Sequence, residues 1–204
     1  RFKDSLISRI GKLPIGVRTG TEAGEERVER EDPDVLIVAV GSEPVIPDIP
    51  GISDTHVMHV LDTYWEPEKI GERVVIIGGG LAGCETGMHL AALGKSVTIV
   101  EMMDRLATDA TESHRIALFG MMDGRVRYHA RTLCTRITPA GITAIVEDGS
   151  ERSFEADTVV YAAGQKARSD TAFGLCRAAP RQYFLIGDCT SPRKVKEAVH
   201  EGYH

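Results

Sequence analysis

Cysteine is scarce in this 204-residue sequence, and its placement excludes two kinds of site. The four cysteines are far apart, at Cys84, Cys134, Cys176 and Cys189. No C-x-x-C pair and no zinc-ligand spacing occurs, so neither a disulfide framework nor a structural zinc site is predicted. We expect reduced structural thiols in a cytoplasmic protein.

The sequence also lacks long apolar runs and an excess of positive charge. No run of about 18 apolar residues occurs, so no transmembrane helix is predicted, and no signal-peptide pattern is present at the start. The formal net charge of −6 argues against a nucleic-acid or anionic-membrane partner. A hydrophobic content of 42% suffices for a core in one large or two small domains. Because the chain starts at Arg1 instead of Met, we expect a fragment of a longer protein.

Residues 74–101 contain the strongest motif of the sequence. Val74–Ile77 is an apolar run typical of a buried strand, and three glycines spaced G-x-G-x-x-G follow it. Next come a helical stretch, Cys84–Leu93, and a second apolar run, Val97–Val100, which ends in Glu101. This order of strand, glycine loop, helix and strand predicts a unit that binds a dinucleotide.

Each position of the glycine loop has a physical role in this interpretation. Gly78 permits a sharp turn out of the strand, Gly80 lets the backbone approach a pyrophosphate, and Gly83 lets the helix pack close to the strand. Leu81 and Ala82 lie at the helix N-terminus, which presents free N–H groups and a positive dipole end to the phosphates. These five residues are candidate cofactor-binding residues.

Glu101 is the candidate for binding the adenosine ribose. It follows Gly83 by 18 residues, close to the roughly 20 expected for this acid. A carboxylate accepts hydrogen bonds from ribose hydroxyls and repels a 2′-phosphate, which favours NADH over NADPH. Arg105, four residues further on, leaves 2′-phosphate binding open as an alternative.

The rest of the chain predicts further elements on both sides of this unit. Helices are expected at 2–10, 59–65, most of 102–123 and 195–204. Strands are expected at 15–19, 34–40, 126–129, 131–138, 141–146, 152–154, 158–162 and 184–186, with 34–40 and 184–186 buried. The segment 21–32 is expected to be a solvated hairpin or turn, and 43–52 a proline-rich connector. The segment 165–182 is expected to be rich in turns.

Three further motifs resemble the two-dinucleotide-domain flavoproteins of the glutathione-reductase-like class. They are DVLIVAVGSEPVIPDIPG at 34–51, ADTVVYAAGQKAR at 156–168 and FLIGDC at 184–189. The resemblance implies an α/β fold in which a Rossmann-like NAD(P)-binding domain, 69–166, is inserted in a partial FAD-binding domain, 1–68 and 167–204. It also implies that Asp188 hydrogen-bonds the ribityl chain of the flavin.

Within that class the sequence is similar to the C-terminal half of old-yellow-enzyme-like reductases, such as 2-enoate and 2,4-dienoyl-CoA reductases. The phrases VAVGSEPVIPDIPGI and GGGLAGCETGMHLAALGKSVTIVE carry this likeness. Those proteins have an N-terminal barrel with FMN and an iron–sulfur cluster, so the resemblance implies such a barrel as the missing partner. The disulfide-reductase branch is disfavoured because no closely spaced cysteine pair is available.

Only one G-x-G-x-x-G loop is present, and its position matches the NAD loop of that class. The first FAD strand and its own loop would then lie upstream of Arg1. A sheet without an inner strand exposes unpaired backbone and apolar groups. We therefore expect 70–165 to fold firmly, the segments 1–68 and 167–204 to be loose, swapped or differently packed, and FAD to bind poorly.

Three other residues are candidates with open alternatives. The resemblance places Glu85 near the nicotinamide ribose and carboxamide, whereas a surface glutamate in a first helical turn would look the same. Gly164 ends a strand at the carboxyl edge of the presumed NAD sheet, where ligands bind, so nicotinamide contact and an ordinary turn are both open. Gly41 offers the same choice on the FAD side.

The sequence predicts no metal site and no catalytic side chain. The segment 200–204 matches H-E-x-x-H, but a glycine interrupts the helix and no third ligand follows. The predicted function is hydride transfer from NADH to a flavin in an enoate-type reductase, with the protein positioning cofactors that carry the chemistry. A nucleotide-binding or electron-relay module without hydride chemistry and a structural docking domain are the alternatives.

Overall fold

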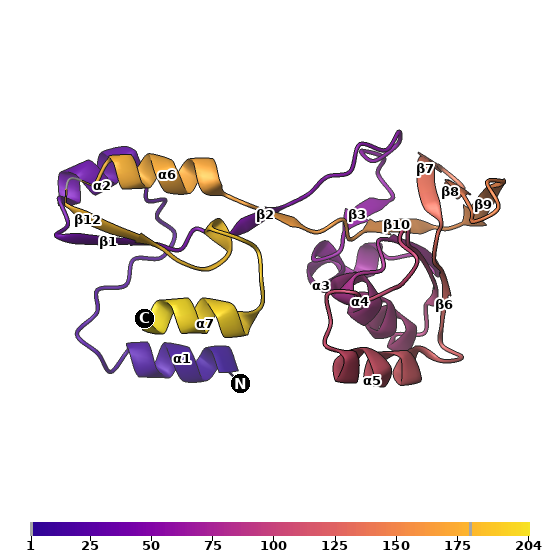
Figure 1. Ribbon diagram of the computed structural model, residues 1–204, viewed down its shortest axis with the longest axis horizontal. Coiled ribbons are helices and arrows are strands. Elements are labelled where there is room, and N and C mark those ends of the chain that lie inside the picture. Colours follow the sequence, from indigo (N-terminus) through magenta and orange to yellow (C-terminus); the bar gives the residue numbers. More distant parts are fainter. Residues whose placement is uncertain (1, 180) are drawn as a thin grey trace. The chain divides into compact units, whose positions relative to one another are not determined.

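The computed structural model describes residues 2–179 and 181–204 and divides into two compact units. Unit 1 comprises residues 1–41 and 167–204, and unit 2 comprises residues 42–166. Helices and parallel strands occur in both units, so the fold is α/β, as the sequence predicts (Figure 1). Among the described residues, no helix has the length and apolar character needed to span a bilayer.

A five-stranded parallel sheet forms the centre of unit 2, with strand order β3-β10-β4-β5-β6 (Figure 1). Its strands are β3 (Val57–His59), β4 (Arg73–Ile77), β5 (Ser96–Val100), β6 (Val126–His129) and β10 (Thr158–Tyr161). Ile77 at the end of β4 is in register with Val100 of β5 and with Tyr161 of β10. The chain leaves β4 towards β5 and β6 on one side and later returns to β10 on the other side. The switch point of the sheet therefore lies between β4 and β10.

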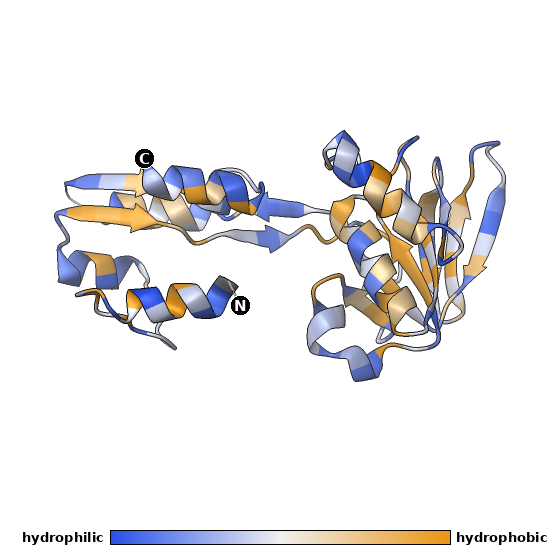
Figure 2. Cartoon of the chain, turned by 90° about the horizontal axis from the view of Figure 1, so that it is seen from below, coloured by the Kyte–Doolittle hydropathy of each residue, from blue (hydrophilic) through white to orange (hydrophobic). Residues whose placement is uncertain are grey.

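Helices cover one face of this sheet, and an antiparallel sheet covers the other (Figure 1). The first layer contains α4 (Leu81–Ala92) and α5 (Glu112–Met122), while α3 (Asp62–Trp65) and the 3-10 turn η1 (Pro67–Lys69) connect β3 to β4. The second layer contains β7 (Leu133–Thr138), β8 (Gly141–Ile145) and β9 (Glu151–Glu155). Val74 and Ile76 pack in the helical layer, whereas Val75 packs against the antiparallel layer, as alternation along a strand requires. Figure 2 shows the central strands among the most hydrophobic segments of the unit.

Unit 1 contains a smaller sheet of two parallel strands, β1 (Val35–Val38) and β12 (Gln182–Leu185). Its helices are α1 (Phe2–Ile10), α2 (Glu25–Glu31), α6 (Ser169–Arg177) and α7 (Val195–Tyr203), with a 3-10 turn, η2 (Gly187–Cys189). The core of the unit is a small cluster of buried side chains from α2, β1, α6 and η2: Val28, Val38, Ala172, Leu175, Cys176 and Cys189.

The chain passes between the two units at β2 (Ser42–Pro44) and β11 (Gln165–Ala167), which pair with each other. Lys166 Nζ lies 2.8 Å from Glu43 Oε1. The hydroxyl of Ser42 donates to Gln165 Oε1 at 3.5 Å. The strand that enters unit 2 and the strand that leaves it are therefore neighbours.

The predicted elements from Val74 to Tyr161 are largely confirmed, but two helices occupy segments predicted as turns. α2 lies within 21–32, where only Val28 is buried among charged side chains, so no apolar period marks it. α6 lies within 165–182 and buries Ala172, Leu175 and Cys176, which are spaced as on one helix face. Conversely, the strand predicted at 15–19 is wrong, since these exposed residues have no strand partner.

Several strand predictions also need correction. The sequence predicts buried strands at 34–40 and 184–186. Ile37 is nevertheless 61% exposed and Phe184 48% exposed, because the two-stranded sheet of β1 and β12 leaves one of its faces uncovered. Val57–His59 forms an edge strand of the main sheet, where the sequence predicts no strand and a helix that begins at residue 59. In 102–123 only α5 is helical, because the segment before it folds back on the glycine loop, with Ala107 N–H donating to Gly79 O at 2.7 Å.

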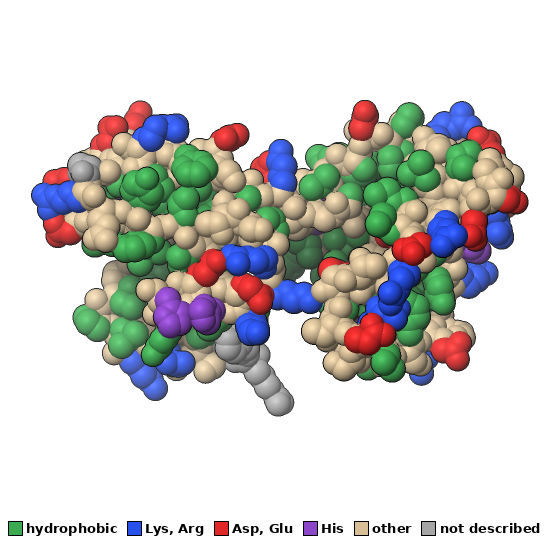
Figure 3. All heavy atoms as spheres, viewed as in Figure 1, with side chains coloured by type: hydrophobic (Ala, Val, Ile, Leu, Met, Phe, Trp, Pro, Cys, Tyr) green, Lys and Arg blue, Asp and Glu red, His purple; other side chains and the backbone are tan. Residues whose placement is uncertain are grey.

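Charged side chains are interspersed over the face shown in Figure 3, where no large area carries a single sign. The ion pairs of the chain include Arg18 with Glu31 at 2.6 Å and Lys95 with Glu72 at 3.0 Å. This surface therefore carries no broad positive field of the kind that attracts nucleic acid.

Candidate dinucleotide-binding site

The glycine loop, residues 78–83, joins the end of β4 to the start of α4. Gly78 has a φ of +108°, which favours glycine, and a Cβ there would lie 2.4 Å from the carbonyl oxygen of Ala162. A Cβ on Gly83 would lie 2.0 Å from the carbonyl oxygen of Gly78. The first turn of α4 therefore packs directly on the loop and on the end of β10.

Gly80 differs from these two glycines because its surroundings are open. It is the N-cap residue of α4, with φ −63° and ψ 178°, a conformation that other residues also adopt. The nearest atom to a Cβ at this position would be Asp109 Oδ1, at 3.7 Å. Folding of the chain therefore does not require glycine at this position.

Asp109 contacts the N-terminus of α4 and was missed by sequence reasoning. The backbone N–H of Leu81 donates to Asp109 Oδ1 at 2.8 Å, and the neighbouring Ala82 is exposed. A carboxylate is stabilised at a helix N-terminus by the free N–H groups and the dipole. The contact shows that the N–H of Leu81 is accessible to an anionic oxygen. In the sequence, only the place of Asp109 in the polar loop before α5 could have suggested it.

Glu101 follows β5, and its half-buried carboxylate contacts the glycine loop. Oε2 accepts a hydrogen bond from the N–H of Gly79 at 2.6 Å, and Oε1 accepts one from the N–H of Met103 at 2.8 Å. Each carboxylate oxygen has a second lone pair, so acceptor capacity for ribose hydroxyls remains. Arg105 lies near α5, with Nη2 4.0 Å from Glu112 Oε2.

A pocket of about 590 Å³ lies at the carboxyl edge of the sheet beside this loop. Gly78 and Glu101 line it, together with Ala162 after β10 and with Thr132 and Leu133 beyond β6. Open α/β sheets bind ligands at this edge, next to the switch point. The pocket is large enough for part of a dinucleotide and has the mixed polar and apolar lining of ligand sites.

The thiol of Cys84 lies under the loop and is fully buried. Burial raises its pKa to about 12, with smaller contributions from the carboxylates of Asp109, Glu101 and Glu85. Sγ donates a hydrogen bond to the carbonyl oxygen of Gly79 at 3.3 Å. Cys84 is therefore a neutral structural thiol at physiological pH and not a nucleophile.

Gly78 and Glu101 line the pocket, whereas the candidates Gly80–Gly83, Glu85 and Gly164 are not among its lining residues. Glu85 is exposed on α4, and its Oε1 lies 3.5 Å from Nε2 of His114 on α5. Gly164 has a φ of +91°, and no atom lies within 4 Å of a Cβ built there. Its carbonyl oxygen accepts the N–H of Val45 at 3.0 Å, which joins the end of β10 to the chain after β2.

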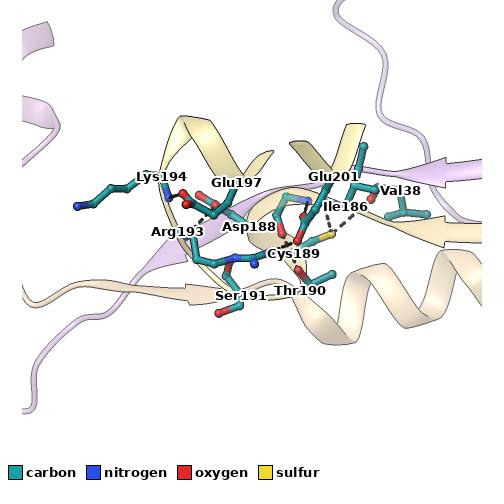
Figure 4. A network of polar contacts seen from close by, with 11 residues as sticks. Val38, Ile186, Asp188, Cys189, Thr190, Ser191, Arg193, Lys194, Glu197 and Glu201 are labelled. Carbon is teal, nitrogen blue, oxygen red and sulfur yellow. Dashed lines mark hydrogen bonds and ion pairs between the residues drawn. The ribbon is translucent and has the colours of Figure 1, made fainter. Parts of the chain in front are cut away.

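A second pocket, of about 430 Å³, lies at the carboxyl edge of the small sheet in unit 1. Gly41 after β1 and Asp188 after β12 both line it. Asp188 Oδ1 accepts the N–H of Arg193 at 3.1 Å, and Figure 4 shows this contact beside the start of α7. The same network holds Cys189, whose thiol donates to the carbonyl oxygen of Ile186 at 3.1 Å. The residues that the flavoprotein resemblance names on the FAD side are therefore brought to one cavity.

The H-E-x-x-H segment has another use in the fold. Glu201 Oε2 accepts the N–H of Gly187 at 2.7 Å, and its other oxygen pairs with Arg193 (Figure 4). These contacts, the backbone one first, hold the pKa of Glu201 below its usual range. No group of three His, Cys, Asp or Glu side chains suited to a metal ion occurs in the described residues.

Comparisons of the sequence with known proteins show which family the chain resembles. The sequence matches the family described as pyridine nucleotide-disulphide oxidoreductase over residues 17–202. It is 34% identical over 210 residues to an NADH oxidase of Thermoanaerobacter brockii, which covers 99% of this chain and 32% of the relative. It is 27% identical over 207 residues to a cinnamate reductase of Clostridium sporogenes, which covers 100% of this chain and 30% of the relative.

A solved structure gives the same result for the fold. The complex of 2-naphthoyl-CoA reductase with 2-naphthoyl-CoA superimposes with a TM-score of 0.89 at 32% identity, over 97% of this chain and 30% of that chain. The present chain spans about a third of the length of each of these relatives.

Proposed function

Because the chain belongs to the pyridine nucleotide-disulphide oxidoreductase family, we propose that it is the NADH-binding part of a flavin-dependent oxidoreductase. Family membership implies NAD(P)H and FAD as cofactors. The observation that carries the proposal is the pocket beside Gly78 and Glu101, at the switch point of the sheet. The proposed domains are an NAD(P)H-binding domain, 69–166, inserted in parts of an FAD-binding domain, 1–68 and 167–204. The compact unit that contains the first of these begins earlier, at residue 42.

The residues at the glycine loop fit a dinucleotide. Gly80 is open to a ligand, and the N–H of Leu81 already bonds a carboxylate oxygen in the position that suits a phosphate. Ala82 follows on the same exposed turn. The positive end of α4 stabilises the pyrophosphate charge, and Glu101 accepts hydrogen bonds from the ribose.

Glu101 favours NADH over NADPH in this proposal. Its carboxylate is fixed by the N–H groups of Gly79 and Met103, so a 2′-phosphate would meet a negative charge that cannot easily move away. Arg105 would have to leave the neighbourhood of Glu112 to compensate that charge.

Gly164 and Glu85 complete the proposed set on the nicotinamide side. The open, positive-φ turn at Gly164 allows a ligand to approach the backbone after β10. Glu85 would have to leave His114 of α5 to reach a nicotinamide ribose.

In unit 1, Gly41 and Asp188 are proposed to contact the flavin. Both line one cavity, and the carboxylate of Asp188 retains an oxygen for a ribityl hydroxyl. The one G-x-G-x-x-G loop of the sequence lies in unit 2. We therefore propose that these 204 residues alone bind FAD weakly, since no second pyrophosphate loop is available.

The chemistry belongs to the cofactors, because NADH supplies a hydride and a flavin accepts it. The residues of this chain bind the dinucleotide, fix its orientation and exclude water from the pocket. The buried neutral Cys84 remains a packing residue in this role.

The whole protein is proposed to reduce enoate or enoyl-type substrates. The names of two relatives, cinnamate reductase and 2-naphthoyl-CoA reductase, support a conjugated acid or acyl thioester as the substrate class. The chain spans about a third of these relatives, which leaves room for a further barrel of the same chain carrying FMN and an iron–sulfur cluster.

The cofactor assignment is tested by titrating NADH and NADPH separately into the 204-residue chain and following nucleotide fluorescence. We expect NADH to bind more tightly, and Glu101→Gln to reduce that preference by about tenfold through loss of the carboxylate charge. Glu147→Gln is the control, since Glu147 is an exposed partner of Arg131 outside the pocket. Tighter binding of NADPH would refute the role of Glu101.

The alternative of a nucleotide-binding relay is separated by a second measurement. NADH added to the full-length protein should bleach the flavin absorbance if hydride transfer occurs. Nucleotide binding without bleaching would favour the relay, and no NADH-induced thermal shift of the chain would favour a docking domain.

A further inference from the structure

A second cleft of unit 2, of about 280 Å³, lies between the main sheet and β9. It shares no lining residue with the pocket beside the glycine loop. Its lining residues are Arg73, Ser96, Thr98, Arg127 and His129 from the main sheet and Arg152, Ser153, Phe154 and Glu155 from β9. Arginine, histidine and hydroxyl side chains therefore meet in one cavity.

Strand register places the first wall of this cleft. Thr98 of β5 is opposite Arg127 of β6, and Val100 is opposite His129. Val100 packs in the core shared with the antiparallel sheet, so side chains at alternate positions, including Thr98 and His129, face that layer. Arg127 donates from Nη2 to Ser96 Oγ at 3.1 Å and from Nε to Thr98 Oγ1 at 3.3 Å. Its guanidinium is thus held in place by neutral acceptors, with N–H groups to spare.

The second wall is built around the buried ring of Phe154. The guanidinium carbon of Arg152 lies 5.0 Å from the centre of this ring, in a cation–π arrangement. The ring of His129 lies 5.0 Å from the same ring centre. Arg152 and His129 therefore both contact the ring of Phe154.

The charge in the cleft is only partly balanced. Arg73 at its rim is neutralised, because it donates to Asp157 Oδ1 at 2.7 Å and to Glu155 Oε2 at 2.5 Å. Among the described residues, no carboxylate lies within ion-pair distance of Arg127 or Arg152. Both arginines line the cleft with His129, and the pKa of His129 is lowered first by burial and then by the charges of Arg152 and Arg127.

We propose that this cleft binds a small anion that carries a phosphate group. Arg127 and Arg152 would donate to the phosphate oxygens, and the planar guanidinium fork suits that geometry. The hydroxyls of Ser96 and Thr98 keep Arg127 oriented. The cleft is about half the volume of the glycine-loop pocket, so it fits a phosphate or a small phosphate ester and not a second dinucleotide.

The test is a titration of the 204-residue chain with inorganic phosphate, followed by ¹H–¹⁵N and histidine-ring NMR. We expect saturable shifts at the amides of β6 and β9, and a higher pKa of His129 with phosphate, because a bound anion offsets the charges of Arg127 and Arg152. Arg127→Gln and Arg152→Gln should each weaken binding by about tenfold. Arg131→Gln is the matched control, since Arg131 pairs with Glu147 outside the cleft.

Both arginine variants are needed. Arg127 also donates hydrogen bonds to two hydroxyls of β5, so replacing its side chain could disturb the sheet as well as the binding of phosphate. Arg152 has no such hydrogen bond among the described contacts, and the amide spectrum reports whether each variant is folded. Ribose 5-phosphate is the second probe: tighter binding than inorganic phosphate identifies an ester as the ligand, and equal binding identifies free phosphate. Both results support the cleft.

Three outcomes would overturn the proposal. In the first, the shifts are confined to the amides of Gly78–Gly83, so phosphate binds only at the glycine loop. In the second, both arginine variants bind phosphate as tightly as Arg131→Gln. In the third, acetate at equal ionic strength causes the same shifts and the same change in the His129 pKa, so the cleft does not recognise phosphate.

Discussion

The two units have a similar glycine turn with a nearby carboxylate, but the sheets behind these turns differ greatly in size. In each, a parallel strand ends in a glycine turn with a carboxylate nearby: Gly78 with Glu101 in unit 2, and Gly41 with Asp188 in unit 1. Unit 2 backs its turn with five strands and a covering layer on each face, whereas unit 1 backs its turn with two strands and one small cluster. A ligand site depends on this support, because the geometry of a loop is only as fixed as the sheet behind it.

The largest expected effect comes from a substitution that disturbs the packing of α4 on the glycine loop in unit 2. Gly83→Ala brings a Cβ to 2.0 Å from a backbone oxygen, so the loop or α4 must shift. We expect the free energy of unfolding to fall by about 2–3 kcal/mol and NADH binding to be lost, as measured by urea unfolding and nucleotide titration.

Gly174→Ala in α6 of unit 1 is the matched control. Its Cβ would meet Glu25 Oε1 at 2.3 Å, but that atom is the far end of a flexible side chain that can move away. Alanine also favours a helix by roughly 0.5–1 kcal/mol over glycine. Equal destabilisation by the two variants would show that backbone crowding at Gly83 is not the cause.

The cysteines offer a direct comparison of the stability of the two units. Each unit has two buried cysteines: Cys84 and Cys134 in unit 2, and Cys176 and Cys189 in unit 1. Burial raises the pKa of Cys84 to about 12 and that of Cys134 to about 11, so labelling requires local opening. We expect a thiol reagent under native conditions to label the unit 1 cysteines about tenfold faster or more, as followed by peptide mass spectrometry. Equal rates would mean that the chain opens as one cooperative body.

Gly80→Ala separates ligand binding from folding. The new methyl group meets no protein atom closer than 3.7 Å, so unfolding should change little, while NADH should bind about tenfold more weakly because the methyl blocks approach of the pyrophosphate. Gly41→Ala in unit 1 provides the contrast. With φ at +74°, it should destabilise that unit by about 1 kcal/mol through backbone strain. Unchanged NADH affinity in Gly80→Ala would remove the loop from the proposed site.

The smallest expected effect concerns Asp109. Asp109→Asn keeps an oxygen for the N–H of Leu81 but removes a negative charge from the place proposed for the pyrophosphate. We expect NADH to bind about two- to fivefold more tightly at low ionic strength, with the gain shrinking as salt is added. Asp148→Asn, in an exposed turn, serves as the control. Weaker NADH binding in Asp109→Asn would instead mean that this carboxylate supports the loop that binds it.

The sequence predicts unit 2 far better than unit 1, for physical reasons. Val74–Ile77 and Val97–Val100 are continuous apolar runs because both faces of their sheet are covered, and the glycine loop between them has a fixed spacing. By contrast, α2 of unit 1 presents one buried residue, Val28. Within unit 2, β3 is the exception, because this three-residue strand is stabilised by pairing with β10, about 100 residues later. Neither leaves a periodic signal in its own segment.

The same limit applies to the sites. Gly78, Gly80 and Glu101 are predictable because a single local motif contains them. Asp109 is not, since it reaches Leu81 only when the segment before α5 folds back across the loop. The cleft that contains Arg127 and Arg152 is assembled from four strands of two sheets, and no spacing along the chain predicts that these two side chains will line one cavity.

The pairing of β2 with β11 has a consequence for how the molecule can be taken apart and rebuilt. The two ends of the segment 42–166 are already adjacent, so this segment resembles a domain inserted at a single position of unit 1. Excising it would leave a short gap that a few residues can bridge. Joining the two ends of the segment and opening the chain at another loop would give a circular permutant. Because the ends are adjacent, the loop that joins them would cost little closure entropy.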